Sequence, residues 1–281
     1  MAAVLGTNVA SLWASKNLQS AQSNMANSVE RLSSGLRINR AKDDSAGLGI
    51  ANALTQQING ANQGIINLND GISIVQTAEG ALTQASEISQ RILSLSIQGA
   101  NGSLSSTQQA SITTEMSSLM TAVNKIETRT KFSGTTLLSG SAISIVSSNV
   151  STDNVSITSG ALAKINGTDG SGATLSTAIG TAATTPNATN FLAIATAASS
   201  FITALDTQRS TLGALQNQME FSVNNITELS SNLSSARSRV IDTDYASETA
   251  SLTKGQILQQ AATAMLAQAN QMPNVILTLL K

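Results

Sequence analysis

The sequence predicts a mainly α-helical protein, a hairpin of long helices in coiled-coil-like packing with a small β-hairpin region at its tip. Apolar residues recur at alternating spacings of four and three near both ends of the chain, and longer series with the same spacing follow inside them. A 3.5-residue apolar period makes a stripe that one helix cannot bury alone. Each end therefore needs a partner helix, and the other end is the first candidate.

Composition narrows the function classes. The 281 residues include no Cys and no His, and aromatic residues make up 2%. This removes most nucleophile–base pairs and transition-metal sites, so we expect no enzyme, no cofactor and no metal. A net charge of −1 gives no basic surface for nucleic acid. No continuous apolar run of about 18 residues is present, so we expect no membrane span, and the first residues lack a secretory signal pattern.

The terminal segments carry the strongest apolar period. A helix is expected over about 8–35, with Gly35 as its C-cap, and another over about 248–281 that ends near Pro273 or kinks there. The apolar stripe that we expect to mediate assembly contains Leu18, Met25, Leu32, Leu258, Met265, Met272 and Ile276. Trp13, the only tryptophan, is either a core anchor or a contact for a partner.

The interior alternates long helices with connectors. After a polar connector over 36–49, in which Asp44 or Ser45 caps the next helix, an apolar series predicts a helix from about 54 to 95. Residues 101–103 break it, and a second helix covers about 112–126. Two alternating segments at 142–146 and 155–158 predict a β-hairpin. Residues 166–190 are rich in Gly, Thr and Ala and read as a dispensable loop. A long helix returns over 194–233, followed by a charged connector over 237–247.

Several ordered segments resemble those of bacterial flagellin. The N-terminal one is ERLSSGLRINRAKDDSAGL (30–48), and the C-terminal ones are ARSRVIDTDYA (236–246) and QANQMP (268–273). The similarity covers about 1–140 and 190–281. Strings of this length in order at both ends are far more specific than a short motif.

The resemblance implies a structural subunit of the extracellular flagellar filament, exported unfolded through the flagellar type III channel. Its partners would be further copies of itself, an export chaperone, and the cap and hook-junction proteins. Residues 1–43 and 245–281 would form a terminal inner-tube domain. Residues 44–244 would form a long-helix rod domain with a short variable centre at about 135–190.

Two further groups of residues are candidate contacts. The connectors hold charges that are either solvated or set the register between neighbouring subunits, namely Arg31, Arg37, Arg40, Asp43, Asp44, Arg237, Arg239 and Asp242. The segment 90–98 resembles the part of flagellin that the vertebrate innate receptor recognises. Arg91, Leu95 and Glu115 match the expected contact positions, although Leu95 also continues the apolar stripe and Arg91 could be an ordinary surface charge.

Two other functions stay open at this point. A hook–filament junction protein shares the helical ends, but the extended segments at 31–48 and 237–246 favour flagellin. A monomeric host-binding ligand or adhesin would act through Arg91, Leu95 and Glu115. Filament formation by the purified protein separates the first function from the others.

Overall fold

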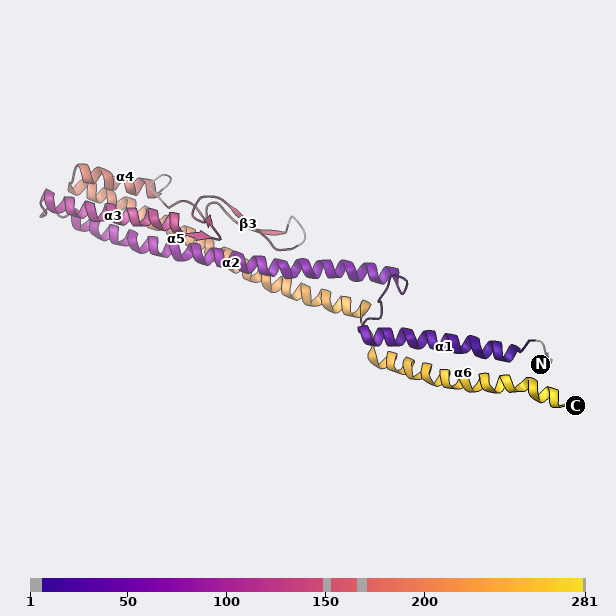
Figure 1. Ribbon diagram of the computed structural model, residues 1–281. Helices are drawn as coiled ribbons and strands as arrows, with labels where there is room; N and C mark the ends of the chain where they lie inside the picture. The colour runs from indigo at the N-terminus through magenta and orange to yellow at the C-terminus, as the bar shows by residue number, and fades with distance from the viewer. Residues whose placement is uncertain (1–6, 149–152, 166–170, 280–281) are drawn as a thin grey trace. The chain divides into compact units, whose positions relative to one another are not determined.

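The computed structural model describes residues 7–148, 153–165 and 171–279, and for 272–279 it describes the helical backbone only. The described residues form six helices and four short strands, which confirms the mainly α class (Figure 1). The elements are α1 (Val9–Ser34), α2 (Ser45–Gly99), α3 (Ser106–Arg129), β1 (Lys131–Phe132), β2 (Thr135–Thr136), β3 (Ile143–Val146), β4 (Asn154–Ile157), α4 (Ser171–Thr184), α5 (Ala188–Ile241) and α6 (Tyr245–Leu279).

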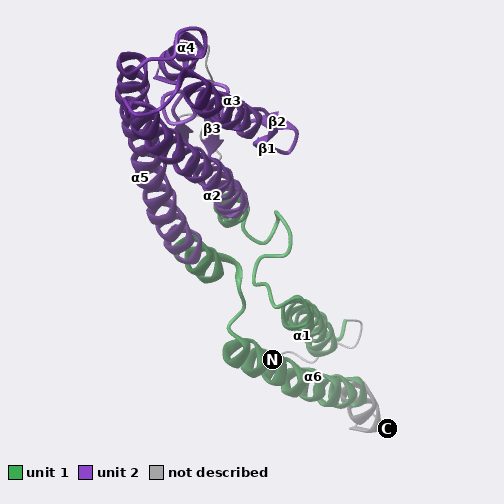
Figure 2. Ribbon diagram, turned by 90° about the vertical axis from the view of Figure 1, so that its left-hand side faces the viewer, with its two compact units in different colours: residues 1–56, 232–281 green, residues 57–231 purple. Residues whose placement is uncertain are grey.

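The chain divides into two compact units (Figure 2). Unit 1 comprises Met1–Gln56 with Asn232–Lys281, and unit 2 comprises Gln57–Ser231. The division therefore falls inside α2 and α5, whereas the sequence suggested boundaries at the connectors, 43/44 and 244/245. Each unit has a core of its own, and the two cores differ in character.

Unit 2 is built around a heptad-spaced core. Leu68, Val75 and Leu82 of α2 follow one another at intervals of seven residues and are fully buried. Leu205, Leu212 and Met219 of α5 do the same. The apolar series predicted a buried stripe on each of these helices, and the structure places both stripes in one continuous cluster with α3. Large aliphatic side chains dominate this core, as expected for helices that pack side by side.

The predicted β-hairpin is present as antiparallel β3 and β4, with Ile143 opposite Ile157 and Val146 opposite Asn154. It lies alongside α2, where the Asn67 side-chain amide donates to the Val146 carbonyl at 2.9 Å, so it is not at the far end of the helical hairpin (Figure 1). A tighter antiparallel pair, β1 and β2, precedes it.

The expected loop over 166–190 is wrong for its described part, residues 171–190. Residues 171–184 form helix α4, and α5 begins at Ala188. Leu175, Ile179 and Ala182, spaced by four and three, are buried in the core of unit 2. Small Ala, Thr and Gly residues around them hid this period in the sequence. A short, Gly-containing helix needs tertiary packing to be stable, and α4 packs against α3. This part of the centre therefore belongs to the core of unit 2.

The C-terminal connector is shorter than predicted. Helix α5 continues to Ile241, so Arg237 and Arg239 lie in its last turns, where positive charge complements the carbonyl end of a helix. Helix α6 begins at Tyr245 and continues past Pro273 to Leu279.

Helix α5 qualifies the expectation that no segment could span a membrane. It contains an 18-residue window of mean hydropathy 1.4, long and apolar enough to cross a membrane by length and composition alone. Core helices pass the same test, and a third of the window (33%) is buried. Phe191, Ile194 and Phe201 of α5 lie in the core of unit 2, which accounts for much of its apolar character.

Candidate assembly surface

Helices α1 and α6 form an antiparallel pair within unit 1. At one end the Asn8 side chain donates to the Ala269 carbonyl at 2.7 Å, and at the other Arg31 lies 3.6 Å from Glu248. Asn8 also caps α1, because its side-chain oxygen accepts from the Ser11 amide. The pairing of the two ends that the apolar period indicated is therefore present within one chain.

Small residues make this helix pair close. The residues buried between α1 and α6 are Ala14, Ala21, Ser28, Gly255, Ala262 and Ala269. At the Gly255 position a β-carbon would lie 3.5 Å from the β-carbon of Met25, so the backbones approach closely there. The alanines belong to the apolar period of the two ends, but the sequence did not indicate that they, rather than the larger residues, would be the buried ones.

The predicted apolar stripe is divided by this packing. Leu18, Met25 and Leu32 of α1 are half-buried beside the small residues that lie between the two helices. On α6, Leu258 and Met265 lie on the surface instead, and Met265 is 64% exposed. The side chains of Met272 and Ile276 lie outside the described residues. Among the described side chains, Leu258 and Met265 of α6 thus remain exposed.

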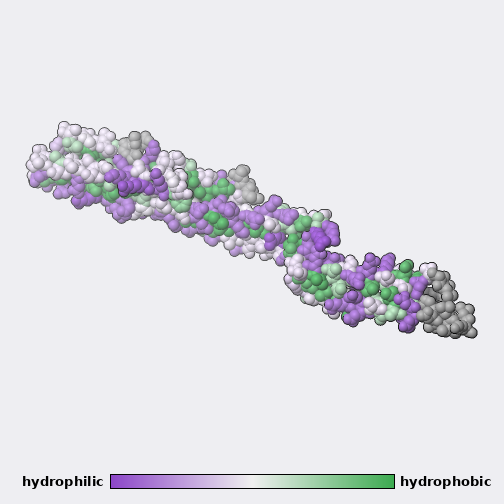
Figure 3. All heavy atoms as spheres, in the orientation of Figure 1, coloured by the Kyte–Doolittle hydropathy of each residue, from purple (hydrophilic) through white to green (hydrophobic). Residues whose placement is uncertain are grey.

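An apolar groove of about 710 Å³ runs along the α1–α6 pair. Trp13, Leu258 and Met265 line it together with alanines of both helices. Trp13 is 60% exposed, so it is not the core anchor considered from the sequence. The surface of this pair shows separate apolar areas among polar ones (Figure 3). Exposed apolar residues gathered in a groove are typical of a surface that binds another protein.

Backbone hydrogen bonds join the two connectors. Leu36 and Asp242 form an isolated antiparallel bridge, in which the Arg37 amide donates to the Ile241 carbonyl at 2.7 Å and the Thr243 amide to the Gly35 carbonyl at 3.0 Å. Gly35 makes this possible because its φ of 72° is open to glycine at little cost. The Arg37 guanidinium adds a bond to the Val240 carbonyl at 2.5 Å. We call these contacts the connector bridge.

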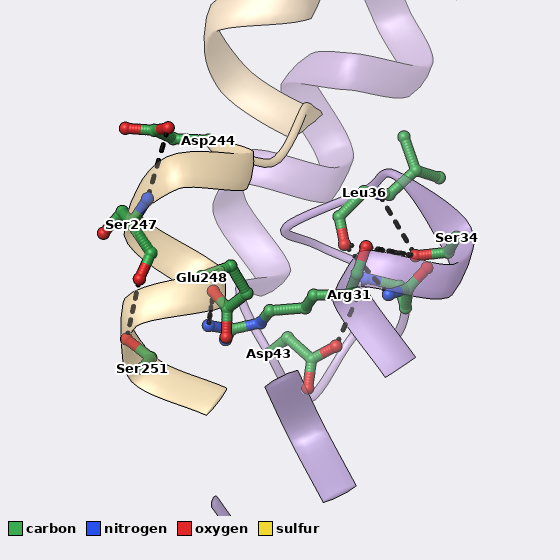
Figure 4. A network of polar contacts seen from close by, with 9 residues as sticks. Arg31, Ser34, Leu36, Asp43, Asp244, Ser247, Glu248 and Ser251 are labelled. Atoms are coloured by element: carbon green, nitrogen blue, oxygen red, sulfur yellow. Dashed lines mark hydrogen bonds and ion pairs between the residues drawn. The ribbon is translucent and has the colours of Figure 1, made fainter. Parts of the chain in front are cut away.

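Other charged connector residues are also held within the chain. Arg31 reaches from α1 toward Glu248 on α6 (Figure 4), and Arg40 pairs with Glu30 at 2.7 Å. Asp44 accepts from the Gly47 amide at 2.8 Å, as predicted for an N-cap of α2. These contacts are intramolecular, so each of these charged groups already has a partner within its own subunit. Asp242 contributes to the bridge through its backbone.

Asp43 organises the turn between α1 and α2. Its carboxylate accepts from the amides of Arg40 at 3.0 Å and Asn39 at 3.2 Å. The hydrogen bond from the Arg40 amide is the largest cause that lowers the pKa of Asp43 below its ordinary value of 3.8. Burial opposes this shift, while the Asn39 amide and the charges of Lys42 and Arg31 add to it.

The receptor candidates separate into two kinds. Arg91 on α2 and Glu115 on α3 are exposed and form an ion pair at 2.9 Å. Leu95 is 2% exposed and belongs to the core of unit 2. The subunit itself covers the Leu95 side chain, so of the three expected contact positions only Arg91 and Glu115 lie on the surface.

These features define a class of protein: a helical structural subunit with a packed core in unit 2 and an uncovered apolar groove between its terminal helices. Among the described residues no three His, Cys, Asp or Glu side chains are grouped to hold a metal ion. The comparisons with known proteins give the family. Residues 5–143 match the bacterial flagellin N-terminal helical region, and residues 195–280 match the C-terminal helical region.

Full-length relatives agree with these matches. Polar flagellin F of Vibrio parahaemolyticus is 34% identical over 376 aligned positions that cover all of both chains. Flagellin of Bacillus subtilis is 38% identical over 302 positions, 98% of each chain. The flagellar filament 33 kDa core protein of Treponema phagedenis is 34% identical over 285 positions, 99% of this chain and 100% of that one.

The chain belongs to the bacterial flagellin family. It is a structural subunit of the flagellar filament and not an enzyme. The relatives are flagellins over their whole length, which favours a filament subunit over a junction protein.

Proposed function

We propose that the groove between α1 and α6 is covered, in the filament, by the same helices of neighbouring subunits. The observation that carries this proposal is the division of the α6 stripe. All four residues line the groove, but Ala262 and Ala269 are buried against α1, whereas Leu258 and Met265 are exposed. A face that a subunit cannot cover with its own residues is covered by repetition of the same contact, and a contact that does not close propagates as a helix.

This proposal gives the two parts of the chain different places. Residues 1–43 and 245–281 form the inner layer, and residues 44–244 form the surrounding layer, with the centre over about 135–190 facing outward. The difference between the two cores supports it. Unit 2 buries large aliphatic residues by itself, whereas unit 1 buries mainly alanines and leaves large residues for others.

A pair of substitutions at Met265 tests the groove. Met265→Gln keeps the length of the side chain and makes it polar, and we expect it to prevent polymerisation. Met265→Leu keeps the apolar character and should polymerise like the parent protein. Sedimentation and electron microscopy of salted-out protein measure assembly, and circular dichroism confirms that both variants are folded. Normal filaments from Met265→Gln would refute the groove as the contact.

We also propose that the charged connector residues without an ion-pair partner in the described part of the subunit set the register between neighbouring subunits. No ion pair is recorded for Arg237 or Arg239 within the described ranges 7–148, 153–165 and 171–279, whereas Arg31 and Arg40 have partners. Electrostatic contacts give specificity more than strength. Arg239→Glu should therefore change filament form or salt dependence more than subunit stability, and an unchanged filament would assign these charges to the solvent.

Export in the unfolded state through the flagellar type III channel is part of the same proposal, with an export chaperone and the cap and hook-junction proteins as partners. The chain has no cysteine, so no disulfide opposes unfolding. Family membership supports the route. A strain that lacks the export apparatus should retain the protein in the cell, and its appearance in the medium at normal levels would contradict this route.

A second candidate function is recognition by the vertebrate innate flagellin receptor. It is favoured by one observation, the exposed Arg91–Glu115 pair that joins two of the three expected positions across α2 and α3. An exposed ion pair contributes little to stability, so both charges can be changed with the subunit intact. Arg91→Glu should lower activation of receptor-expressing cells, and unchanged activation would reduce the pair to a surface ion pair.

A further inference from the structure

Three Asn-Gly dipeptides occur in the chain, and the structure gives two of them opposite backbone surroundings. Asn59–Gly60 lies in the middle of α2, and Asn101–Gly102 lies in the turn between α2 and α3. The third, at Asn166, lies outside the described residues. Both described asparagines are exposed, so they differ mainly in backbone conformation. This pair of sites isolates the effect of the backbone on asparagine chemistry.

We propose that Asn101 is a site of spontaneous deamidation in the folded protein, and that Asn59 is protected. In this reaction the backbone nitrogen of Gly102 attacks the side-chain carbonyl carbon of Asn101. A carbon–nitrogen bond forms, the proton of the Gly102 amide is lost to water or hydroxide, and ammonia leaves from the side chain. Water then opens the resulting succinimide to aspartate or isoaspartate. The net reaction converts the side-chain amide and one water to a carboxylic acid and ammonia, and it needs no oxidant or reductant.

The hydrogen bonds of the turn favour the attack. The Asn101 side-chain oxygen accepts from the Ser103 amide at 3.1 Å and from the Ser103 hydroxyl at 3.0 Å. That oxygen gains negative charge when the carbonyl is attacked, and donors already directed at such an oxygen lower the barrier. The turn thus places two donors at the atom where charge develops.

The nucleophile is also free at this site. Within the part of the chain that the structure describes, the Gly102 amide donates no hydrogen bond, whereas the amides of Asn101 and Leu104 do. At Asn59 the following amide belongs to the regular i→i−4 ladder of α2, which holds its hydrogen and fixes its direction. Gly102 carries no β-carbon to obstruct the approach.

The product changes the end of α2. A carboxylate at position 101 adds negative charge beside the carbonyl end of a 55-residue helix, which is unfavourable there. Isoaspartate also lengthens the backbone of the turn by one bond, and the buried Gln109 side chain bonds the nearby Gly99 carbonyl at 2.9 Å. Ageing protein should therefore acquire a more acidic form modified at this turn.

Peptide mapping by mass spectrometry tests the proposal. The full chain is incubated at neutral and alkaline pH, folded or in urea, and the peptides that contain Asn59 and Asn101 are compared. In the folded protein Asn101 should convert several-fold faster than Asn59, and faster at alkaline pH. In urea the two rates should converge. Equal rates in the folded protein, or no conversion at Asn101, would overturn the proposal.

Two variants test the roles of the Gly102 amide as nucleophile and of the Ser103 hydroxyl as hydrogen-bond donor. A β-carbon at position 102 meets nothing within 4 Å, so Gly102→Ala should fold normally and slow conversion several-fold by obstruction. Ser103→Ala removes one donor and should slow it about two- to tenfold, the effect of one net hydrogen bond. Conversion as fast as the parent in Gly102→Ala would exclude attack by this amide. An unchanged or faster rate in Ser103→Ala would exclude the assistance of the hydroxyl.

Discussion

The backbone of α2 at Gly64 lies directly against the carbonyl oxygen of Ser147, so closely that a β-carbon at position 64 would overlap that oxygen. Ser147 follows β3, is buried, and donates from its amide to the Asp153 carbonyl at 3.1 Å. The missing side chain at Gly64 therefore lets the β-hairpin lie on the helix. It also accounts for a glycine that, by helix propensity alone, weakens α2.

Gly64→Ala is expected to destabilise unit 2. The overlap with the Ser147 carbonyl should cost about 1–3 kcal/mol, partly offset by a gain of about 1 kcal/mol in helix propensity. Gly80→Ala, in the same helix with no atom within 4 Å of the new β-carbon, should stabilise by up to about 1 kcal/mol. Thermal unfolding followed by circular dichroism compares the two. The same change in melting temperature for both would show that the hairpin does not depend on Gly64.

Leu175→Ala is expected to destabilise the protein by about 2–5 kcal/mol, because this fully buried side chain joins α4 to the core. Thr177→Ala on the exposed side of α4 is the matched control and should change stability by less than about 0.5 kcal/mol. Denaturant unfolding measures both. An unchanged stability of Leu175→Ala would show that α4 does not contribute to the core, and it would support the expectation that this segment can be removed.

Acid should loosen the turn between α1 and α2. Because the pKa of Asp43 is lower in the folded chain than in the unfolded one, its contribution to stability is complete above the unfolded value of about 3.8 and is lost as pH falls through the folded value. The protection of the Asn39 and Arg40 amides against hydrogen exchange, relative to the intrinsic rate at each pH, should therefore fall below about pH 4. Asp43→Asn, compared above that pH, should already exchange faster. Equal protection in both proteins would assign the turn's order to other contacts.

Deletion of residues 1–35 or 246–281 should abolish polymerisation and leave unit 2 folded. The core of unit 2 runs from Ala61 to Ile226 and contains no residue from either terminal segment. Sedimentation should detect no filaments, while circular dichroism should still show a cooperative helical transition. Filaments from either truncated protein would contradict the proposed place of the terminal helices.

The apolar period alone determined much of this protein. It predicted every described helix except α4, the pairing of the two ends and the heptad-spaced residues such as Leu68 and Leu212, because side chains four and three apart share one face of any helix. The alternating residues near 143–157 predicted the β-hairpin for the same kind of reason. The long segments around Arg31 and Arg237 gave the family resemblance, which the comparisons confirmed.

The tertiary structure decided which neighbour each face meets. Ala262 and Ala269 are buried between α1 and α6, while Leu258 and Met265 stay exposed, because small residues let two helices approach closely. Packing against α3 made a helix of the weakly patterned segment around Leu175. The core of unit 2 also covers Leu95, whose period is compatible with core and surface alike. A period fixes a stripe on a helix, but only the other helices determine what covers it.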